Sequence, residues 1–142
     1  MTKAIKVRLI GRREFVSFPL LEIGPIEAKI DTGAYTSSLH CENISINYEN
    51  SKPILYFTVE QGALKTYRFS EFTKKKIKNS FGEMEERFVI KTLIRIRKKK
   101  IRTTISLSNR DNMRYPVLIG RRLLKGKFLI DVNRIHTGGI LI

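Results

Sequence analysis

Short apolar runs, most of them alternating with polar residues, recur along the chain and are separated by turn-forming residues. This alternation predicts β-strands, because successive strand side chains point to opposite faces of a sheet. Helical periodicity is rare, and one short helix is expected at Arg121–Leu124. The expected strands are Ala4–Ile10, Phe15–Phe18, Ile26–Ile30, Ser38–Ile46, Pro53–Val59, Leu64–Phe69, Lys75–Asn79, Arg87–Ile96, Lys100–Leu107, Val117–Ile119, Phe128–Val132 and Gly139–Ile142.

The runs are rich in β-branched and aromatic residues, with Gly, Asn and Ser between them. That composition is typical of a closed β-barrel or a β-sandwich. A chain of 142 residues is the size of one domain and can bury a substantial core. We therefore expect a mostly β, single-domain protein over residues 1–142, with its short helix near the C-terminus.

Charge narrows the choice of partners. The chain has 28 Lys and Arg against 13 Asp and Glu, a net charge of +15. Such a surface attracts anions, which include nucleic acid, the ribosome, an anionic membrane surface and an acidic peptide, although a solvated basic face is an equal alternative. The segment Arg95–Arg102 has six cations in eight residues, a pattern more typical of a solvated hairpin tip than of a phosphate contact.

Other features of the sequence bear on the compartment. No stretch approaches the ~20 apolar residues of a membrane-spanning helix, and the first residues lack the core of a signal peptide. Cys41 is the single cysteine, so an internal disulfide is excluded. These features predict a cytoplasmic protein that does not enter the membrane.

The most informative motif is Asp31-Thr32-Gly33. The apolar run Ile26–Ile30 leads into a carboxylate at a turn, where glycine allows close approach of the backbone and Ala34 keeps the next position small. Hydroxyl side chains follow at residues 36–38. Taken alone, the tripeptide is more typical of an ordinary turn at the end of a strand.

A second segment changes this interpretation. Val117–Leu124 reads as an apolar strand, Gly120 and a short helix. With Asp31-Thr32-Gly33, it resembles the retropepsin-like aspartic peptidases, whose subunits carry one Asp-Thr-Gly and a later apolar-apolar-Gly-Arg segment. Five motifs follow in the order of the RimK-associated, RimB-like family within that superfamily: Ile10–Glu14, Lys29–Ala34, Leu107–Asp111, Met113–Pro116 and Leu118–Arg121.

The resemblance implies a catalytic pair of aspartates that share one proton. Since the chain has one Asp-Thr-Gly, it implies a homodimer in which Asp31 meets its counterpart. Thr32 would then lock the two loops together, Gly33 would keep the backbone near the substrate, and Gly120, next to Ile119, would let the helical segment pack behind the loop. Arg110 and Asp111 are candidate pocket residues, with a structural ion pair as an equal alternative.

The turn Asn79–Met84 lies between two expected strands, with Gly82 near its tip. By its order relative to Gly120, the resemblance implies a flap, formed by Ser80, Phe81 and Gly82, that closes over the substrate. A plain surface hairpin fits the sequence about as well.

The common label of the RimK-associated family refers to an ATP-dependent zinc protease, and the residues support neither word. His40 and Cys41 are adjacent, so on a strand they point to opposite faces, and no His-Glu-x-x-His spacing joins them or His136. No Gly-x-x-x-x-Gly-Lys segment is present to hold phosphates. We expect no metal and no other cofactor.

The RimK-type ligase associated with this family extends glutamate tails, notably on a small-subunit ribosomal protein. The resemblance therefore implies a peptidase for peptide or protein substrates, including glutamylated tails, and association with the ribosome. Arginine pairs bidentately with carboxylate, so the cations predicted to bind the substrate are Arg110, Arg114, Arg121 and Arg122.

Two rival functions remain at this stage. A non-enzymatic basic β-barrel could bind RNA or the ribosome, with bases stacked on exposed aromatic rings among Tyr67, Phe69, Phe72 and Tyr115. A retropepsin fold that has lost activity could recognise peptide alone. The three functions make different demands on Asp31, which only a peptidase requires.

Overall fold

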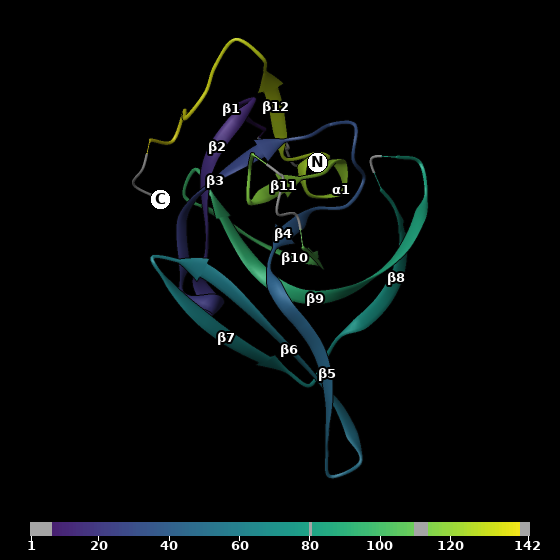
Figure 1. Cartoon of the computed structure of the whole chain (residues 1–142). Helices are drawn as coiled ribbons and strands as arrows, with labels where there is room; N and C mark the ends of the chain where they lie inside the picture. Colours follow the sequence, from purple (N-terminus) through teal and green to yellow (C-terminus); the bar gives the residue numbers. More distant parts are fainter. Residues whose placement is uncertain (1–6, 80, 110–113, 140–142) are drawn as a thin grey trace, which may run out of the picture.

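The computed structural model describes residues 7–79, 81–109 and 114–139, and the fold is mostly β, as predicted (Figure 1). The single α-helix of the described part is α1, Arg121–Leu124, at the predicted position and too short to cross a membrane. The strands are β1 (Arg8–Gly11), β2 (Arg13–Phe18), β3 (Ile23–Ile30), β4 (Ser38–His40), β5 (Glu42–Glu49), β6 (Lys52–Gln61), β7 (Ala63–Phe69), β8 (Thr73–Lys78), β9 (Met84–Ile96), β10 (Lys99–Ser108), β11 (Val117–Ile119) and β12 (Phe128–Asp131).

The largest sheet has seven strands in the order β10-β4-β11-β3-β2-β9-β8. Because β9 also pairs with β10, its strands form a hydrogen-bonded ring from which only β8 extends. Strands β5, β6 and β7 form a separate three-stranded sheet, and β1 and β12 form a parallel pair. The predicted closed barrel is thus a ring within the largest of three sheets.

Two of the expected strands differ in the structure. The predicted strand Ser38–Ile46 is two strands, β4 in the ring and β5 in the three-stranded sheet, with Cys41 between them. The Cys41 N–H donates to the Ser108 carbonyl oxygen over 3.0 Å, and the chain enters the other sheet at Glu42, where two consecutive polar residues, Glu42 and Asn43, interrupt the apolar alternation. Of the predicted strand Gly139–Ile142, Gly139 has φ of +66° and directly follows a turn at Thr137 and Gly138, and the remainder lies outside the described residues.

The core lies inside the ring and beneath the three-stranded sheet. Its fully buried members include Phe18, Leu39, Phe57, Ile94 and Ile119. Strand β3 pairs with β2 on one side and with β11 on the other. Asp31 directly follows β3, so the backbone that carries its carboxylate is held by a strand with a neighbour on each side.

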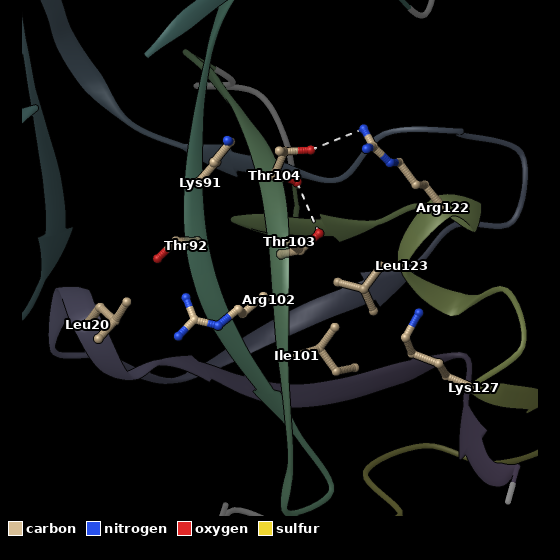
Figure 2. A pocket seen from close by; sticks show the side chains of 10 residues that line it. All are labelled: Leu20, Lys91, Thr92, Ile101, Arg102, Thr103, Thr104, Arg122, Leu123 and Lys127. Carbon is tan, nitrogen blue, oxygen red and sulfur yellow. Dashed lines mark hydrogen bonds between the residues drawn. The ribbon is translucent and has the colours of Figure 1, made fainter. Parts of the chain in front are cut away.

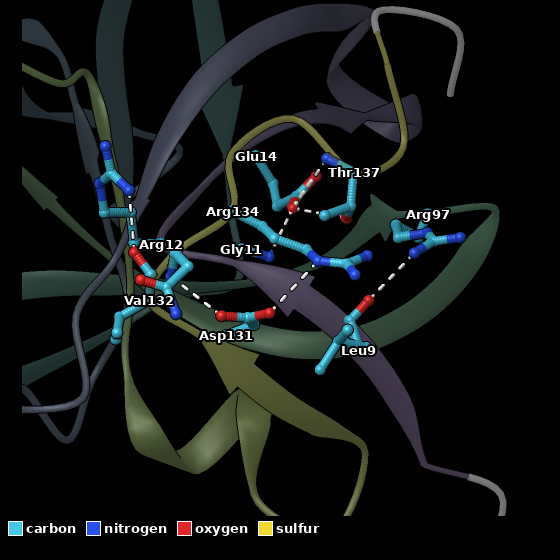
Figure 3. A network of polar contacts seen from close by, with 10 residues as sticks. Leu9, Gly11, Arg12, Glu14, Arg97, Asp131, Val132, Arg134 and Thr137 are labelled. Atoms are coloured by element: carbon cyan, nitrogen blue, oxygen red, sulfur yellow. Dashed lines mark hydrogen bonds and ion pairs between the residues drawn. The ribbon is translucent and has the colours of Figure 1, made fainter.

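The chain after β12 is bound to the start of the ring by a buried carboxylate (Figure 3). Glu14 accepts hydrogen bonds from Gly11 N, 2.7 Å away, and from Thr137 Oγ1, 2.6 Å away. The backbone N–H groups of Thr137 and Gly138 donate to the same carboxylate. Arg12 contributes a parallel contact, with Nη1 2.8 Å from the Val132 carbonyl oxygen. Residues 132–138 therefore brace β2 and, through it, β3.

Candidate active site

The loop that carries Asp31 is held by backbone hydrogen bonds. Ile30 and Ile119 are register partners in the β3–β11 pair, and the Asp31 N–H donates to the Ile119 carbonyl oxygen over 2.8 Å. Beyond the strand, Asp31 Oδ1 accepts from Gly33 N over 3.1 Å, and the Asp31 carbonyl oxygen accepts from Ala34 N over 3.2 Å. Asp31 therefore closes a tight turn, with its carboxylate fixed beside Gly33.

Gly120 allows β11 and the start of α1 to pack against this loop. A Cβ at residue 120 would lie 2.6 Å from the carbonyl oxygen of Thr36 and 2.7 Å from that of Tyr35, closer than any side chain is accommodated. The Gly120 N–H donates to Ser37 Oγ over 3.0 Å, where both groups are buried. The requirement for glycine at residue 120 comes from this close packing, since its φ of −93° is ordinary.

Arg121 connects α1 with the Asp31 loop at three points. Its Nη1 lies 2.9 Å from the Thr32 carbonyl oxygen, and its backbone N–H donates to the Ala34 carbonyl oxygen over 2.8 Å. Its guanidinium carbon lies 5.8 Å from the centre of the Tyr35 ring, within the range of a cation–π contact. A single arginine thus both orients the loop and brings a positive charge to it.

A cavity of about 710 Å³, here called the Asp31 cavity, lies between this loop and the β8–β9 hairpin, which curves toward the loop in Figure 1. Its cations are Lys76, Lys78, Arg87 and Arg121, and Asp31 is the one acidic residue among the described residues that line it. Arg87 Nε pairs with Glu85 Oε1 over 2.5 Å, whereas no ion pair of the described residues includes either lysine. The lining residues are Asp31, Gly33, Ala34, Tyr35, Thr36, Ser38, Lys76, Ile77, Lys78, Asn79, Arg87, Leu118 and Arg121.

The predicted flap is a hairpin that borders the cavity mainly through its strands and through Asn79 at the start of the turn. Asn79 Oδ1 accepts from the backbone N–H groups of Phe81 and Glu83 at 3.0 Å each, which orders the turn. Phe81 is 87% exposed and Gly82 has φ of +80°, and neither lines the Asp31 cavity. Ser80 lies outside the described residues. The contribution of the strand has a signal in the sequence, namely the lysine-rich run over residues 74–78.

The other arginines predicted to bind the substrate lie elsewhere. Arg110 and Asp111 are outside the described residues. Arg114 is exposed, with its guanidinium 5.7 Å from the centre of the Tyr115 ring, and it does not line the Asp31 cavity. Arg122 directs Nη1 toward Thr104 Oγ1, 3.4 Å away, and lines two other cavities. Arg121 is therefore the described arginine of the predicted set that borders Asp31.

The two histidines contact glutamate side chains of the protein, and the cysteine is buried. His136 Nε2 contacts Glu27 Oε2 at 2.5 Å and its ring stacks on Phe15, and His40 Nε2 lies 3.7 Å from Glu42 Oε1. Burial raises the pKa of the Cys41 thiol to about 12. Within residues 7–79, 81–109 and 114–139, no three His, Cys, Asp or Glu residues lie close enough together to hold a metal ion.

The aromatic residues considered for stacking on bases have partners within the protein. Tyr67 stacks on Phe57, and its hydroxyl donates to the Leu21 carbonyl oxygen over 2.6 Å. Phe69 also stacks on Phe57, and Phe72 packs edge-on against Phe88. The Tyr115 hydroxyl accepts a hydrogen bond from Arg13 over 3.2 Å.

Comparison with known proteins gives two kinds of relative. The chain is 35% identical over 136 residues to a probable alpha-L-glutamate ligase of Desulfotalea psychrophila, covering 92% of this chain and 29% of that protein. A probable alpha-L-glutamate ligase of Shewanella halifaxensis is 34% identical, with 87% and 28% covered. The chain therefore spans less than a third of the length of these relatives.

The fold also matches a crystal structure of Lpg0085, a protein of unknown function from Legionella pneumophila. The TM-score is 0.75 at 26% identity, and the match covers 92% of this chain and 98% of that one. The model of the RimB-like family, described as retropepsin-like aspartic endopeptidase RimB, matches residues 9–138. This match includes the Asp31 loop, Gly120 and the β8–β9 hairpin, and it confirms the resemblance drawn from the five motifs. The chain belongs to the RimB-like family of retropepsin-like aspartic endopeptidases.

Proposed function

We propose that this protein is an aspartic peptidase that acts as a homodimer on acidic, glutamyl-rich peptides. The observation that carries the proposal is the composition of the Asp31 cavity, in which one carboxylate faces Lys76, Lys78, Arg87 and Arg121. The carboxylate supplies the catalytic chemistry of the family, and the surrounding cations favour a substrate that brings negative charge.

The catalytic chemistry requires a second carboxylate. Among the described residues that line the cavity, Asp31 is alone in carrying one, so a second copy of the chain must bring its own Asp31. A twofold dimer is the commonest symmetric assembly and would pair the two loops. The ionised aspartate then takes a proton from water, which attacks the peptide carbonyl, while the protonated aspartate polarises that carbonyl and passes its proton to the leaving nitrogen.

The acidic substrate is supported from two sides. Arg121 and the two lysines of β8 lie where they can pair with substrate carboxylates, and they meet little competing negative charge inside the cavity. The longer relatives carry the name of a glutamate ligase. A peptidase segment that accompanies a ligase is well placed to shorten the polymer that the ligase makes.

Cleavage of a glutamate-tailed peptide tests the proposal. The products of wild type and of Asp31→Asn would be compared by mass spectrometry between about pH 4 and pH 8, a range that brackets a shared-proton carboxylate pair. Asp131→Asn is the matched control, because Asp131 pairs with Arg134 at 3.2 Å and does not line the Asp31 cavity.

We expect cleavage by wild type and by Asp131→Asn, and none by Asp31→Asn. Cleavage by all three proteins would show that Asp31 is not the catalytic residue. If wild type leaves both glutamyl and neutral peptides intact but binds RNA tightly, the peptidase function is wrong and the nucleic-acid-binding function is supported. Sedimentation of wild type with and without peptide would show whether the active species is the dimer.

A further inference from the structure

A second basic region lies on the face formed by β9, β10 and α1, away from Asp31. It consists of two adjoining cavities of about 430 and 720 Å³, which share Lys91, Thr104 and Arg122 in their walls. We call the two together the second basic cavity. Asp31 does not line either part.

The cations in its walls come from several elements (Figure 2). Lys91 on β9 and Thr104 on β10 are register partners, and Arg122 of α1 reaches over to Thr104 Oγ1. In the smaller part, Arg102 extends from β10, and Lys127 follows α1. Positive charge is thus presented from more than one side, as a polyanion requires.

Most of this charge is not neutralised inside the protein. The cations of the second basic cavity are Arg68, Lys75, Lys91, Arg102, Arg122 and Lys127, against Glu71 as the acidic residue among the described lining residues. Arg68 pairs with Glu49 at 2.9 Å, but none of the ion pairs formed by the described residues includes any of the other five. Five like charges gathered around open volume repel one another, and an anionic ligand would relieve that repulsion.

The second basic cavity adjoins the Asp31 cavity along the chain at two places. Lys75 and Arg122 line the second basic cavity, whereas their sequence neighbours Lys76 and Arg121 line the Asp31 cavity. Because successive strand side chains point to opposite faces, Lys75 and Lys76 place the two cavities on either side of β8, which is an edge strand of its sheet. A single acidic chain that passes around this edge would contact both.

We propose that the second basic cavity is an exosite that holds the part of a glutamyl chain lying outside the Asp31 cavity. This inference rests on the proposed function, and it concerns how the substrate is selected rather than how it is cut. Binding at two connected sites raises the effective concentration of the second segment, so affinity rises with tail length. Long tails are then bound in preference to short ones.

The surroundings favour carboxylates over nucleic acid. Single-stranded RNA is bound by cations together with exposed aromatic rings on which bases stack. The aromatic residues in the wall, Phe69 and Phe72, instead pack against Phe57, Phe88 and the core. What remains for a ligand is a set of ammonium, guanidinium and hydroxyl donors, which suits a chain of carboxylates.

Binding can be measured without cleavage in Asp31→Asn. Fluorescence anisotropy would give the affinity for labelled oligoglutamates of about 4 and about 12 residues, the longer of which spans roughly 40 Å when extended. The exosite variant adds Arg122→Gln and Lys127→Gln. The charge-matched control adds Lys52→Gln and Lys125→Gln, at exposed positions that line none of the three cavities.

We expect the long probe to bind about tenfold more tightly than the short one, the exosite variant to lose most of that gain, and the control to keep it. A length gain that survives in the exosite variant would overturn the exosite. So would an RNA of equal charge that displaces the long probe through Arg122 and Lys127 better than oligoglutamate does. Because this assay reports binding alone, a length effect through these two residues would support the exosite even if wild type cleaved no peptide, which is the separate failure of the proposed function.

Discussion

Arg121 donates a hydrogen bond from Nη1 to the carbonyl oxygen of Thr32, 2.9 Å away, and this contact fixes the short helix against the Asp31 loop. Arg121 also lines the Asp31 cavity. The same guanidinium therefore holds the loop in place and adds a positive charge to the cavity. Experiments can measure these two effects separately.

Replacing Arg121 by methionine is expected to loosen the loop and to weaken the binding of an acidic peptide. Hydrogen exchange of the backbone amides at residues 32–36 should accelerate, and kcat/KM for a glutamyl peptide should fall about tenfold or more, since a charge-assisted hydrogen bond is lost. Arg12→Met is the matched control, because Arg12 makes a similar contact with the Val132 carbonyl oxygen at 2.8 Å. Equal acceleration of exchange in the loop of both variants would contradict the local role of Arg121.

Gly120→Ala should destabilise the protein by about 3 kcal/mol, because its Cβ would meet the Thr36 carbonyl oxygen at 2.6 Å. Gly33→Ala is a useful comparison, since its Cβ would approach only Asp31 Oδ1, at 3.3 Å. We expect Gly33→Ala to lose less than about 1 kcal/mol of stability. Urea unfolding would measure both changes, and similar values for the two variants would show that the close packing at residue 120 relaxes at little cost.

Thr92→Val is expected to stabilise the protein by about 1 kcal/mol. The Thr92 hydroxyl oxygen is buried and has no hydrogen-bond partner in the part of the chain that the structure describes. Its register partner Thr103 donates to the Thr104 carbonyl oxygen at 3.3 Å, so Thr103→Val should be neutral or destabilising. Valine keeps the shape of threonine and removes the unsatisfied group. Thermal unfolding of both variants would decide, and a lower melting temperature for Thr92→Val would contradict the prediction.

Cys41 should make stability depend on pH in the alkaline range. Burial raises its pKa from 9.0 to about 12, so folding favours the protonated thiol. The resulting stabilisation is fully present below pH 9.0 and is lost as the pH rises through about 12. In Cys41→Val this loss should be absent, which urea unfolding at about pH 8 and about pH 10.5 would show. At neutral pH the native thiol should react with a thiol reagent only after unfolding.

The parts of the site that depend on short-range sequence could be predicted. Asp31, Gly33 and Gly120 belong to compact motifs, and their roles in the loop follow from turn chemistry and close packing. Lys76 and Lys78 were not identified, because their position depends on how far the β8–β9 hairpin curves toward the loop. Sheet curvature arises from tertiary packing that a strand pattern does not encode.

Two other differences have separate origins. The apolar alternation through Ser38–Ile46 changes phase where Glu42 and Asn43 are both polar, so the sequence does carry a signal for the change of sheet at Cys41. Arg121 and Arg122 are adjacent and chemically identical, yet they border different cavities because α1 turns between them. Neighbouring positions in a helix point in different directions, and only the packed helix shows what each side chain faces.

The pairing of β1 with β12 also has a consequence for how the active protein forms. Arg8 aligns with Phe128 in this pair, so the contact closes nearly the whole described chain into one loop. Contacts between such distant residues slow folding toward the millisecond-to-second range. Ile30 N–H donates to the Arg12 carbonyl oxygen, and Arg12 N–H donates in turn to that of Arg134, so the strand before Asp31 gains its last support from the end of the chain. During synthesis on the ribosome, the Asp31 loop should therefore stay unformed until residue 134 has emerged.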